Sequence, residues 1–225
     1  MSKPAESVEN ETEKTKRPAK ELVYSYVRRK ILNGEMQGGD FIEEKVVSEA
    51  VGVSRTPVRE ALHRLQNDHY ITLTPRRGAV VRQITAKELA EVYESRRLIE
   101  SHAMAHICRE KLTLPSDLRV LYDKMCVTTD SKDFVERAEY DQAFHRAIVA
   151  TTDNRVLVEL YDSLQVRQQR VAIAAMRVHP SRAETIDREH LQLIEALENY
   201  DEQAAVEIIS KHLRPLADVI TRLPV

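Results

Sequence analysis

The chain has 225 residues, of which 42% are hydrophobic, 5% aromatic and 31% charged, and its formal net charge at neutral pH is −2. This length accommodates one large domain or two small ones, and the near-zero charge excludes an overall cationic field, so any DNA-binding surface has to be a local patch. With only five glycines, the composition favours helices over a turn-rich β fold.

The first 18 residues are mostly Glu, Lys, Thr, Ser and Pro, and we expect this segment to be disordered because it has too little apolar surface to fold. It also lacks the apolar core of a secretory signal. No apolar run approaches the roughly 18 residues that span a membrane. Two isolated cysteines, Cys108 and Cys126, argue against a disulfide framework and for a reducing compartment. These features predict a soluble, cytoplasmic protein.

Three helices and a hairpin are predicted in the first third of the chain. Apolar residues spaced three and four apart indicate a helix over about 22–33, and a short helix is expected over about 43–51. Ser54 is a suitable N-cap for a third helix. Two β-prone runs, at 70–74 and 79–82, are separated by a Pro-Arg-Arg-Gly turn and predict a two-stranded hairpin. Three helices followed by a hairpin form a winged helix.

Beyond residue 84 the sequence predicts helices alone. Thr85 and Glu88 form a Thr-x-x-Glu capping box, Ser181 and Glu184 form a second capping box, and Asp201 is a plausible N-cap. The expected fold is therefore mainly α, with an N-terminal winged helix-turn-helix followed by an all-α helical bundle. The six helices expected in the bundle cover about 85–110, 115–129, 131–151, 154–176, 181–199 and 201–222.

The start of the third helix carries the most specific signal for DNA. Arg55 and Arg59 are four residues apart and share one helix face. A recognition helix places such residues against base edges, where an arginine can donate two hydrogen bonds to a guanine. Ser54 and Thr56 carry hydroxyl groups suited to phosphates beside a helix N-terminus. These four residues predict a DNA-reading helix.

Further arginines surround this helix. The stretch 54–82 holds six arginines and two acidic residues, which is a local cationic patch that the overall charge conceals. Arg76 and Arg77 fall at the predicted hairpin tip, from which a wing can reach the DNA backbone or the minor groove. A solvated basic face without function is the alternative, but the helix spacing, the cap and the hairpin all favour DNA binding.

One aspartate and three histidines of the predicted bundle suggest a metal site. The first two lie four residues apart in one helix, which is a common spacing of helical metal ligands, and the others lie on the apolar sides of two later helices. A histidine among apolar neighbours needs a polar partner, so a shared metal is one explanation. His102 and His106 have the same four-residue spacing and form a rival pair. The candidate set is Asp141, His145, His190 and His212.

With these residues identified, the segment 20–84 resembles the winged helix of the GntR family. The likeness is carried by the strings 39–44 and 52–62 and by Arg77-Gly78. It departs from the family at Gly38, where a proline is usual, and at His69, where a glycine usually ends the recognition helix in a left-handed turn. The resemblance adds Lys45 and Gly78, so the DNA-contacting residues expected are Lys45, Ser54, Arg55, Thr56, Arg59, Arg76, Arg77 and Gly78.

Residues 85–225 resemble the FCD ligand-binding domain that follows the winged helix in the FadR-type branch of that family. The likeness is carried by Arg96 with Glu100, by the strings around Asp141, His190 and His212, and by Asn154 and Asp201. It implies that the aspartate and three histidines named above bind one divalent metal ion, with Zn²⁺, Ni²⁺ and Mn²⁺ all suited to nitrogen and oxygen ligands.

The same resemblance implies that the carboxylate of a small effector fills the open positions of the metal. Arg96 is a candidate second anchor for this carboxylate, because a guanidinium matches its geometry. The alternative for Arg96 is an ion pair with Glu100, four residues along the same helix.

We therefore expect a disordered tail over 1–18, a winged helix-turn-helix DNA-binding domain over 19–84, and an all-helical effector- and metal-binding domain over 85–225. The expected function is that of a metabolite-responsive transcription regulator, and of a repressor rather than an activator. Since one recognition helix reads few base pairs, a homodimer on a pseudo-palindromic operator is expected.

Two alternatives remain open at this point. A metal-dependent hydrolase with an appended DNA-binding module could use open metal positions to activate water, although no general base stands out beside the ligands other than Glu139 and Glu189, which adjoin them in sequence. A metal-free scaffold would hold no ion at all. We expect a regulator and not an enzyme.

Overall fold

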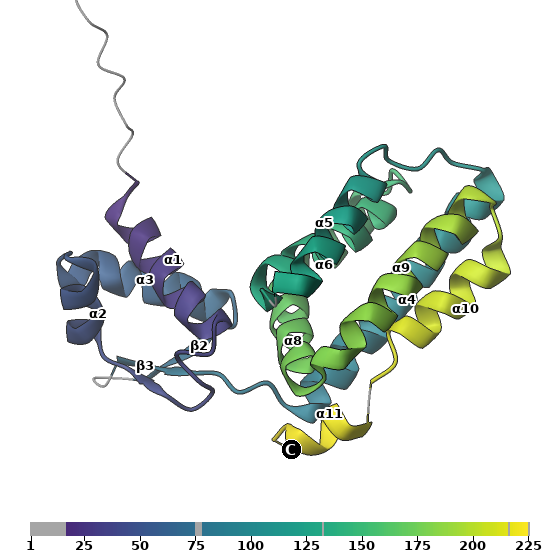
Figure 1. The fold of residues 1–225 in the computed structure, drawn as a ribbon. Coiled ribbons are helices and arrows are strands. Elements are labelled where there is room, and N and C mark those ends of the chain that lie inside the picture. The colour runs from purple at the N-terminus through teal and green to yellow at the C-terminus, as the bar shows by residue number, and fades with distance from the viewer. Residues whose placement is uncertain (1–16, 75–77, 132, 216, 225) are drawn as a thin grey trace, which may run out of the picture.

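The computed structural model describes residues 17–74, 78–131, 133–215 and 217–224 (Figure 1). Residues 1–16 of the expected tail lie outside the described residues, as do Arg76 and Arg77 of the expected wing contacts. None of the helices among the described residues is both long and apolar enough to cross a membrane.

The N-terminal part is a winged helix. Its sheet is antiparallel, with the order β1-β3-β2, and pairs Phe41 with Val80 and Ile71 with Val81. The prediction of a two-stranded hairpin was therefore incomplete, because two-residue β1 is too short to leave a periodic signal. The elements are α1 (Ala19–Leu32), β1 (Phe41–Ile42), α2 (Glu44–Val51), α3 (Arg55–Asn67), β2 (Ile71–Thr74) and β3 (Gly78–Val81).

Two residues at turns have backbone conformations that suit their positions. Gly78 has φ of +99°, and a Cβ added to it would lie 2.3 Å from the carbonyl oxygen of Ile42, so only glycine lets β1 approach β3 there. His69 has φ of +60°, the left-handed conformation expected where the recognition helix ends. Both residues thus hold the wing in place beside α3.

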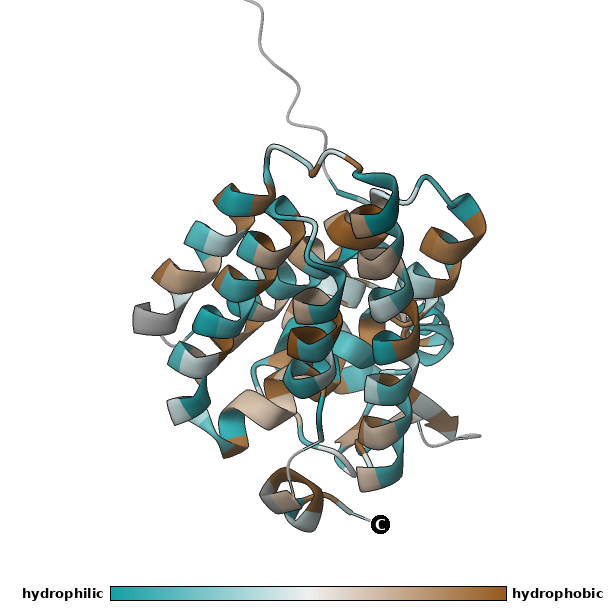
Figure 2. Ribbon diagram, turned by 90° about the vertical axis from the view of Figure 1, so that its right-hand side faces the viewer, coloured by the Kyte–Doolittle hydropathy of each residue, from teal (hydrophilic) through white to brown (hydrophobic). Residues whose placement is uncertain are grey.

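The C-terminal part contains helices and no strand among its described residues, as predicted. α4 lies beside α10 and α11, and α6 lies between α5 and α8 (Figure 1). Hydrophobic and hydrophilic residues alternate along these helices, which are amphipathic (Figure 2). The elements are α4 (Ala86–Glu110), α5 (Leu118–Ser131), α6 (Phe134–Ala150), α7 (Arg155–Ser163), α8 (Gln165–Val178), the 3₁₀ turn η1 (Pro180–Arg182), α9 (Ala183–Glu198), α10 (Glu202–His212) and α11 (Ala217–Arg222).

Two of the expected long helices are each divided in two. The expected helix 154–176 is interrupted at Leu164, whose N–H donates to the carbonyl of Tyr161, three residues back, which tightens the turn between α7 and α8. The expected helix 201–222 ends at His212, because Pro215 has no N–H to continue the helical hydrogen bonds. α11 is consequently a separate short helix.

The helix caps were partly predicted. Thr85 accepts a hydrogen bond from the N–H of Glu88 at 3.0 Å, and Asp201 accepts one from Ala204 at 3.0 Å, as expected. The second capping box was wrong: Ser181 lies inside η1, and α9 begins without a side-chain cap.

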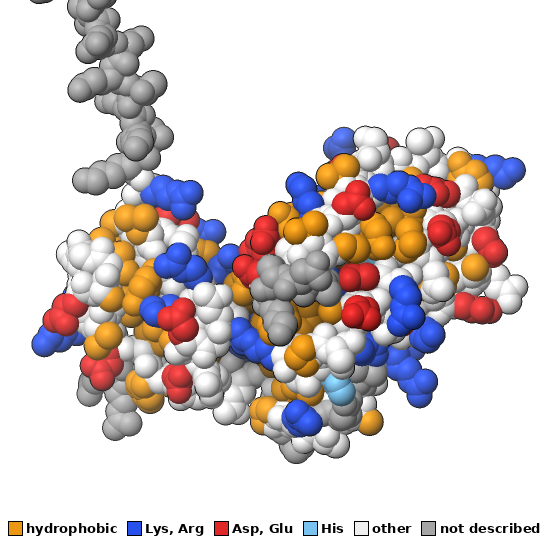
Figure 3. Space-filling model, viewed as in Figure 1, with side chains coloured by type: hydrophobic (Ala, Val, Ile, Leu, Met, Phe, Trp, Pro, Cys, Tyr) orange, Lys and Arg blue, Asp and Glu red, His pale blue; other side chains and the backbone are white. Residues whose placement is uncertain are grey.

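The winged helix packs directly onto the bundle through α8. Ile173 and Met176 of α8 belong to the same buried cluster as Val27 of α1 and Leu65 of α3. Arg170 donates to the carbonyl of His69 at 2.7 Å and to that of Arg82. Arg177, about two turns further along α8, donates to the carbonyl of Leu32. The two parts of the molecule touch along this helix, below an open notch (Figure 3).

Candidate functional site

The four residues expected to bind a metal come together inside the bundle. Nε2 of His145 on α6 lies 3.0 Å from Nε2 of His190 on α9, and that atom lies 3.3 Å from Oδ1 of Asp141. Both histidines are fully buried. With His212 at the end of α10, each residue offers one ligand atom, and these atoms all lie within 4.8 Å of one another.

Two buried carboxylates orient the outer sides of these rings. Oε2 of Glu100 lies 2.7 Å from Nδ1 of His145, and Oε2 of Glu189 lies 3.0 Å from Nδ1 of His212. The His212 contact has hydrogen-bond geometry, whereas the two atoms of the His145 contact lie close together without it. A carboxylate beside Nδ1 favours the proton on that nitrogen, which leaves Nε2 of the same ring as the ligand atom. Sequence reasoning did not assign this role to either glutamate, because the contacts join different helices.

The charges around the cluster favour a bound cation. Burial lowers the pKa of His145, His190 and His212, so the rings favour the neutral form that can act as a ligand. Burial alone would raise the pKa of Asp141, but its hydrogen bond to His190 and the nearby His145 hold that pKa well below the usual range. Several lone pairs therefore converge on one point, and three imidazole nitrogens with one carboxylate oxygen suit a divalent transition metal.

The rival pair lies elsewhere. His102 and His106 stack along α4 with ring centroids 6.4 Å apart. No third potential ligand joins them among the residues that the structure describes.

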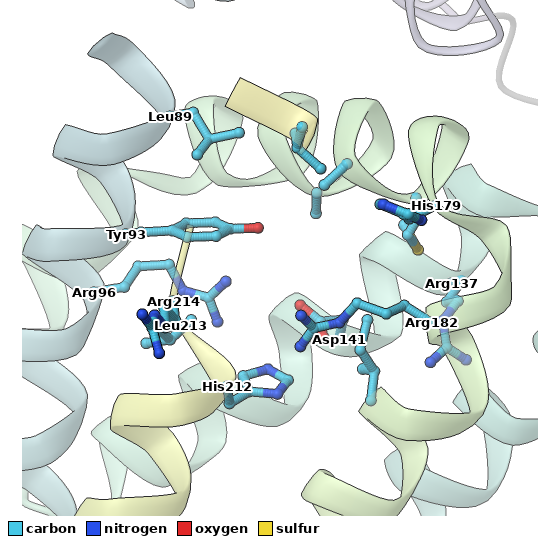
Figure 4. Close-up of a pocket in the computed structure, with 15 residues that line it drawn as sticks. Leu89, Tyr93, Arg96, Arg137, Asp141, His179, Arg182, His212, Leu213 and Arg214 are labelled. Carbon is cyan, nitrogen blue, oxygen red and sulfur yellow. The ribbon is translucent and has the colours of Figure 1, made fainter. Parts of the chain in front are cut away.

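A cavity opens beside the four-residue cluster (Figure 4). It has a volume of about 70 Å³, and it is bordered by Asp141 and His212 of the cluster and by Arg96. Figure 4 shows the hydroxyl group of Tyr93 pointing into it. Its apolar lining comes mainly from α4, α8 and α11, and includes Leu89, Ala172, Ala175, Met176 and Val219.

Arg96 forms the ion pair with Glu100 that the sequence left open as the alternative to an effector anchor. Its Nε donates to Oε1 of Glu100 at 2.8 Å, and both side chains are buried. Its Nη2 is also buried but has no hydrogen-bond partner. Although burial would raise the pKa of Glu100, Arg96 and His145 lower it to about 2, so the ion pair is charged. The ion pair holds the guanidinium in position while one of its N–H groups stays available.

The expected DNA contacts share a second, exposed surface. Lys45, Arg55, Arg59 and Gly78 line one hollow between α2, α3 and the sheet, together with His63, which the sequence analysis did not single out. Nε of Arg59 donates to both carboxylate oxygens of Glu44, at 3.0 and 2.9 Å. Ser54 and Thr56 are exposed at the start of α3. Ser54 occupies the N-cap position as predicted, but the expected capping by its side chain is wrong, because its hydroxyl makes no capping hydrogen bond.

Comparisons with known proteins agree with this architecture. Residues 19–81 match the family described as bacterial regulatory proteins of the gntR family, and residues 91–215 match the FCD domain. The gluconate operon transcriptional repressor of Bacillus subtilis is 27% identical over 202 residues, which cover 88% of this chain and 83% of that protein. The transcriptional repressor RspR of Escherichia coli is 26% identical over 208 residues, which cover 92% of this chain and 90% of that protein.

Solved structures show the same fold. A transcriptional regulator from Rhodococcus sp. RHA1 has a TM-score of 0.69 at 20% identity, and the alignment covers 86% of this chain and 93% of that one. McbR/YncC of Escherichia coli has a TM-score of 0.68 at 23% identity, covering 88% and 94%.

Proposed function

The chain belongs to the GntR family of bacterial transcription regulators and carries an FCD domain, and on this premise we propose that a metal ion and a small carboxylic acid together control its binding to DNA. Its relatives are transcription regulators and not enzymes, so the hydrolase alternative finds no support among them. The chain itself is a DNA-binding regulator with a domain of the kind that binds small molecules.

The metal ion is held by Asp141, His145, His190 and His212. The observation that carries this part of the proposal is the convergence of their ligand atoms within 4.8 Å of one another in a buried site. Glu100 and Glu189 fix two of the rings from outside, as carboxylates commonly do for metal-binding histidines. The ion, which is Zn²⁺, Ni²⁺ or Mn²⁺ by its donor set, supplies a positive charge for an anionic effector.

The effector binds in the adjoining cavity with its carboxylate between the metal and Arg96. The unpartnered Nη2 of Arg96 supports this placement, because a buried N–H without an acceptor is costly and a carboxylate satisfies it.

The DNA-reading surface contacts operator DNA through Arg55 and Arg59 at base edges and through Lys45, Ser54 and Thr56. Arg76, Arg77 and Gly78 complete the contacts from the wing. A homodimer presents two such surfaces to a pseudo-palindromic operator. We expect a cytoplasmic repressor that leaves DNA when the effector binds, in line with the relatives that are named repressors.

Two helices connect the cavity to the winged helix. α4 follows the wing directly and lines the cavity with Leu89 and Arg96. α8 lines the cavity with Met176 and binds the backbone beside α3 through Arg170. A ligand-induced shift of either helix moves the recognition helices of a dimer relative to each other, and a coupling of about 1–3 kcal/mol is typical of such systems.

Elemental analysis combined with selection of DNA from a random pool tests the proposal. About one divalent ion per purified chain and enrichment of an inverted-repeat sequence are the expected results. A chain that retains no metal contradicts the metal site, and a pool without enrichment contradicts sequence-specific DNA binding.

A further inference from the structure

We propose that the ligand of the cavity is a small dicarboxylate, with its second carboxylate bound by Arg182. This inference rests on the proposed function, since it takes the first carboxylate to lie between the metal and Arg96. It names the class of acid that the cavity selects.

The charges around the cavity support a ligand with two negative charges. Its lining contains four arginines, Arg96, Arg137, Arg182 and Arg214, and one carboxylate, Asp141. Three further carboxylates lie within ion-pair distance of lining arginines: Glu100, Asp187 and Glu189. With the histidines counted as neutral, these charges cancel among the described residues. A divalent ion at the four-residue cluster then leaves two positive charges, which a dianion neutralises and a monoanion does not.

Arg182 is the arginine best placed to bind the second carboxylate. Figure 4 shows its guanidinium reaching into the cavity from the side opposite Arg96. Its nearest ion-pair partner, Oε2 of Glu189, is 3.6 Å away, and the same oxygen already lies 3.0 Å from Nδ1 of His212. The pairing of Arg182 in the absence of ligand is therefore weak.

The other two arginines are less suited to this role. Arg137 already donates to the carbonyl of Met125 at 2.8 Å and to the carboxylate of Asp187. Arg214 is exposed where the chain leaves α10. Arg182 is neither as fully paired as Arg137 nor as exposed as Arg214, and its side chain is 25% exposed.

The size and lining of the cavity restrict the body of the ligand. About 70 Å³ is room for a short chain only. Leu89, Ala175 and Val219 contribute apolar surface to the wall of the cavity, and a methylene chain can pack against this surface. Anionic groups on opposite sides of an apolar centre favour a dicarboxylate over a compact dianion such as phosphate.

Calorimetric titration of the purified, metal-loaded full chain tests the inference. Malonate, succinate and glutarate are each compared with the monocarboxylate of the same carbon count, and with inorganic phosphate. We expect the best diacid to bind about tenfold or more tightly than its monoacid, because a charge-assisted hydrogen bond is worth at least that factor. Arg182→Gln should remove most of this preference by weakening diacid binding more than monoacid binding, while Arg182→Lys should restore part of it.

Arg188→Gln is the matched control, because it removes one positive charge from an exposed position of α9, the helix that follows Arg182. The inference is wrong if a monoacid or phosphate binds metal-loaded protein as tightly as the best diacid, if no diacid binds, or if Arg182→Gln keeps the preference. A purified chain without metal is a different result, because it contradicts the proposed function itself. Metal content is therefore measured on every sample before titration.

Discussion

Nδ1 of His145 lies 2.7 Å from Oε2 of Glu100, and both side chains are completely buried. The same carboxylate accepts hydrogen bonds from Nε of Arg96 and from the hydroxyl group of Tyr161, each at 2.8 Å. One glutamate of α4 therefore orients both a candidate metal ligand and the candidate effector anchor. The pairing links the two halves of the proposed site.

Glu100→Gln should weaken metal binding about 10- to 100-fold, because loss of the carboxylate behind a metal-binding histidine typically has that effect. Arg96 also loses its charged partner, so the variant should be less stable as well. Competition with a chromogenic chelator measures metal affinity separately from folding. Glu94→Gln on the exposed side of α4 is the control. Unchanged metal affinity in Glu100→Gln would show that the glutamate serves folding alone.

Removal of the metal should lower the free energy of unfolding by about 2–4 kcal/mol when free metal is in 100- to 1,000-fold excess over its dissociation constant. Thermal unfolding with and without a chelator measures this difference. His190→Ala should unfold identically in both conditions, whereas a variant lacking His102 and His106 should behave as the wild type. The opposite pattern, with metal lost only from the second variant, would transfer the site to the rival pair.

Arg55→Ala should reduce operator affinity by about 1–3 kcal/mol and relax sequence preference at one operator position, since its proposed contact is to a base edge. Gel-shift titrations on operator and random DNA at several salt concentrations provide the measurement. Arg188→Ala, which changes the same charge on α9, should leave both affinities unchanged. Equal losses on both DNAs for Arg55→Ala would mean a backbone contact instead.

Arg77→Ala should weaken binding to operator and random DNA alike, because the wing is proposed to contact the DNA backbone. The slope of log affinity against log salt concentration should fall by about one unit, as expected for one lost phosphate contact. The same titrations measure it. A selective loss on the operator would assign Arg77 to base recognition.

Arg170→Met should loosen the junction between the winged helix and α8. Its two hydrogen bonds to the carbonyls of His69 and Arg82 are partly buried, and each carbonyl left unsatisfied costs up to about 1–3 kcal/mol. Hydrogen exchange of the amides near these two residues should accelerate, while metal content stays unchanged. Lys87→Met, at an exposed position of α4, is the control. Unaltered exchange would show that apolar packing alone holds the junction.

Local signals predicted most of the winged helix and the helical character of the rest. The caps at Thr85 and Asp201 and the left-handed turn at His69 follow from neighbours in sequence, and they were predicted. The end of α10 before Pro215 could have been predicted from the proline itself. The expected helix 201–222 ran through this residue because apolar residues recur with helical spacing on both sides of it. Strand β1 had none, because its two residues are ordered only by pairing with β3.

The candidate site, too, could be predicted only where its residues lie close together in the sequence or carry a recognisable local pattern. Asp141 and His145 share a helix, so their spacing pointed to a joint role, and His190 and His212 were added because they lie among apolar neighbours on later helices; the family resemblance then favoured this set over His102 and His106. The contact of Glu189 with His212 and the position of Arg182 arise only when α9 packs against α10 and the cavity forms. Contacts between distant helices carry no local pattern, and those parts of the site required the three-dimensional structure.

Met176 lines the ligand cavity and also belongs to the buried cluster that contains Val27 and Leu65 of the winged helix. At Met176 the cavity of the helical domain therefore borders directly on the hydrophobic core of the winged helix. A chimera made by joining this helical domain to an unrelated winged helix at residue 84 would expose Ile173 and Met176 and leave Arg170 and Arg177 without acceptors. A functional chimera therefore requires a winged helix whose apolar surface has been redesigned to pack against α8.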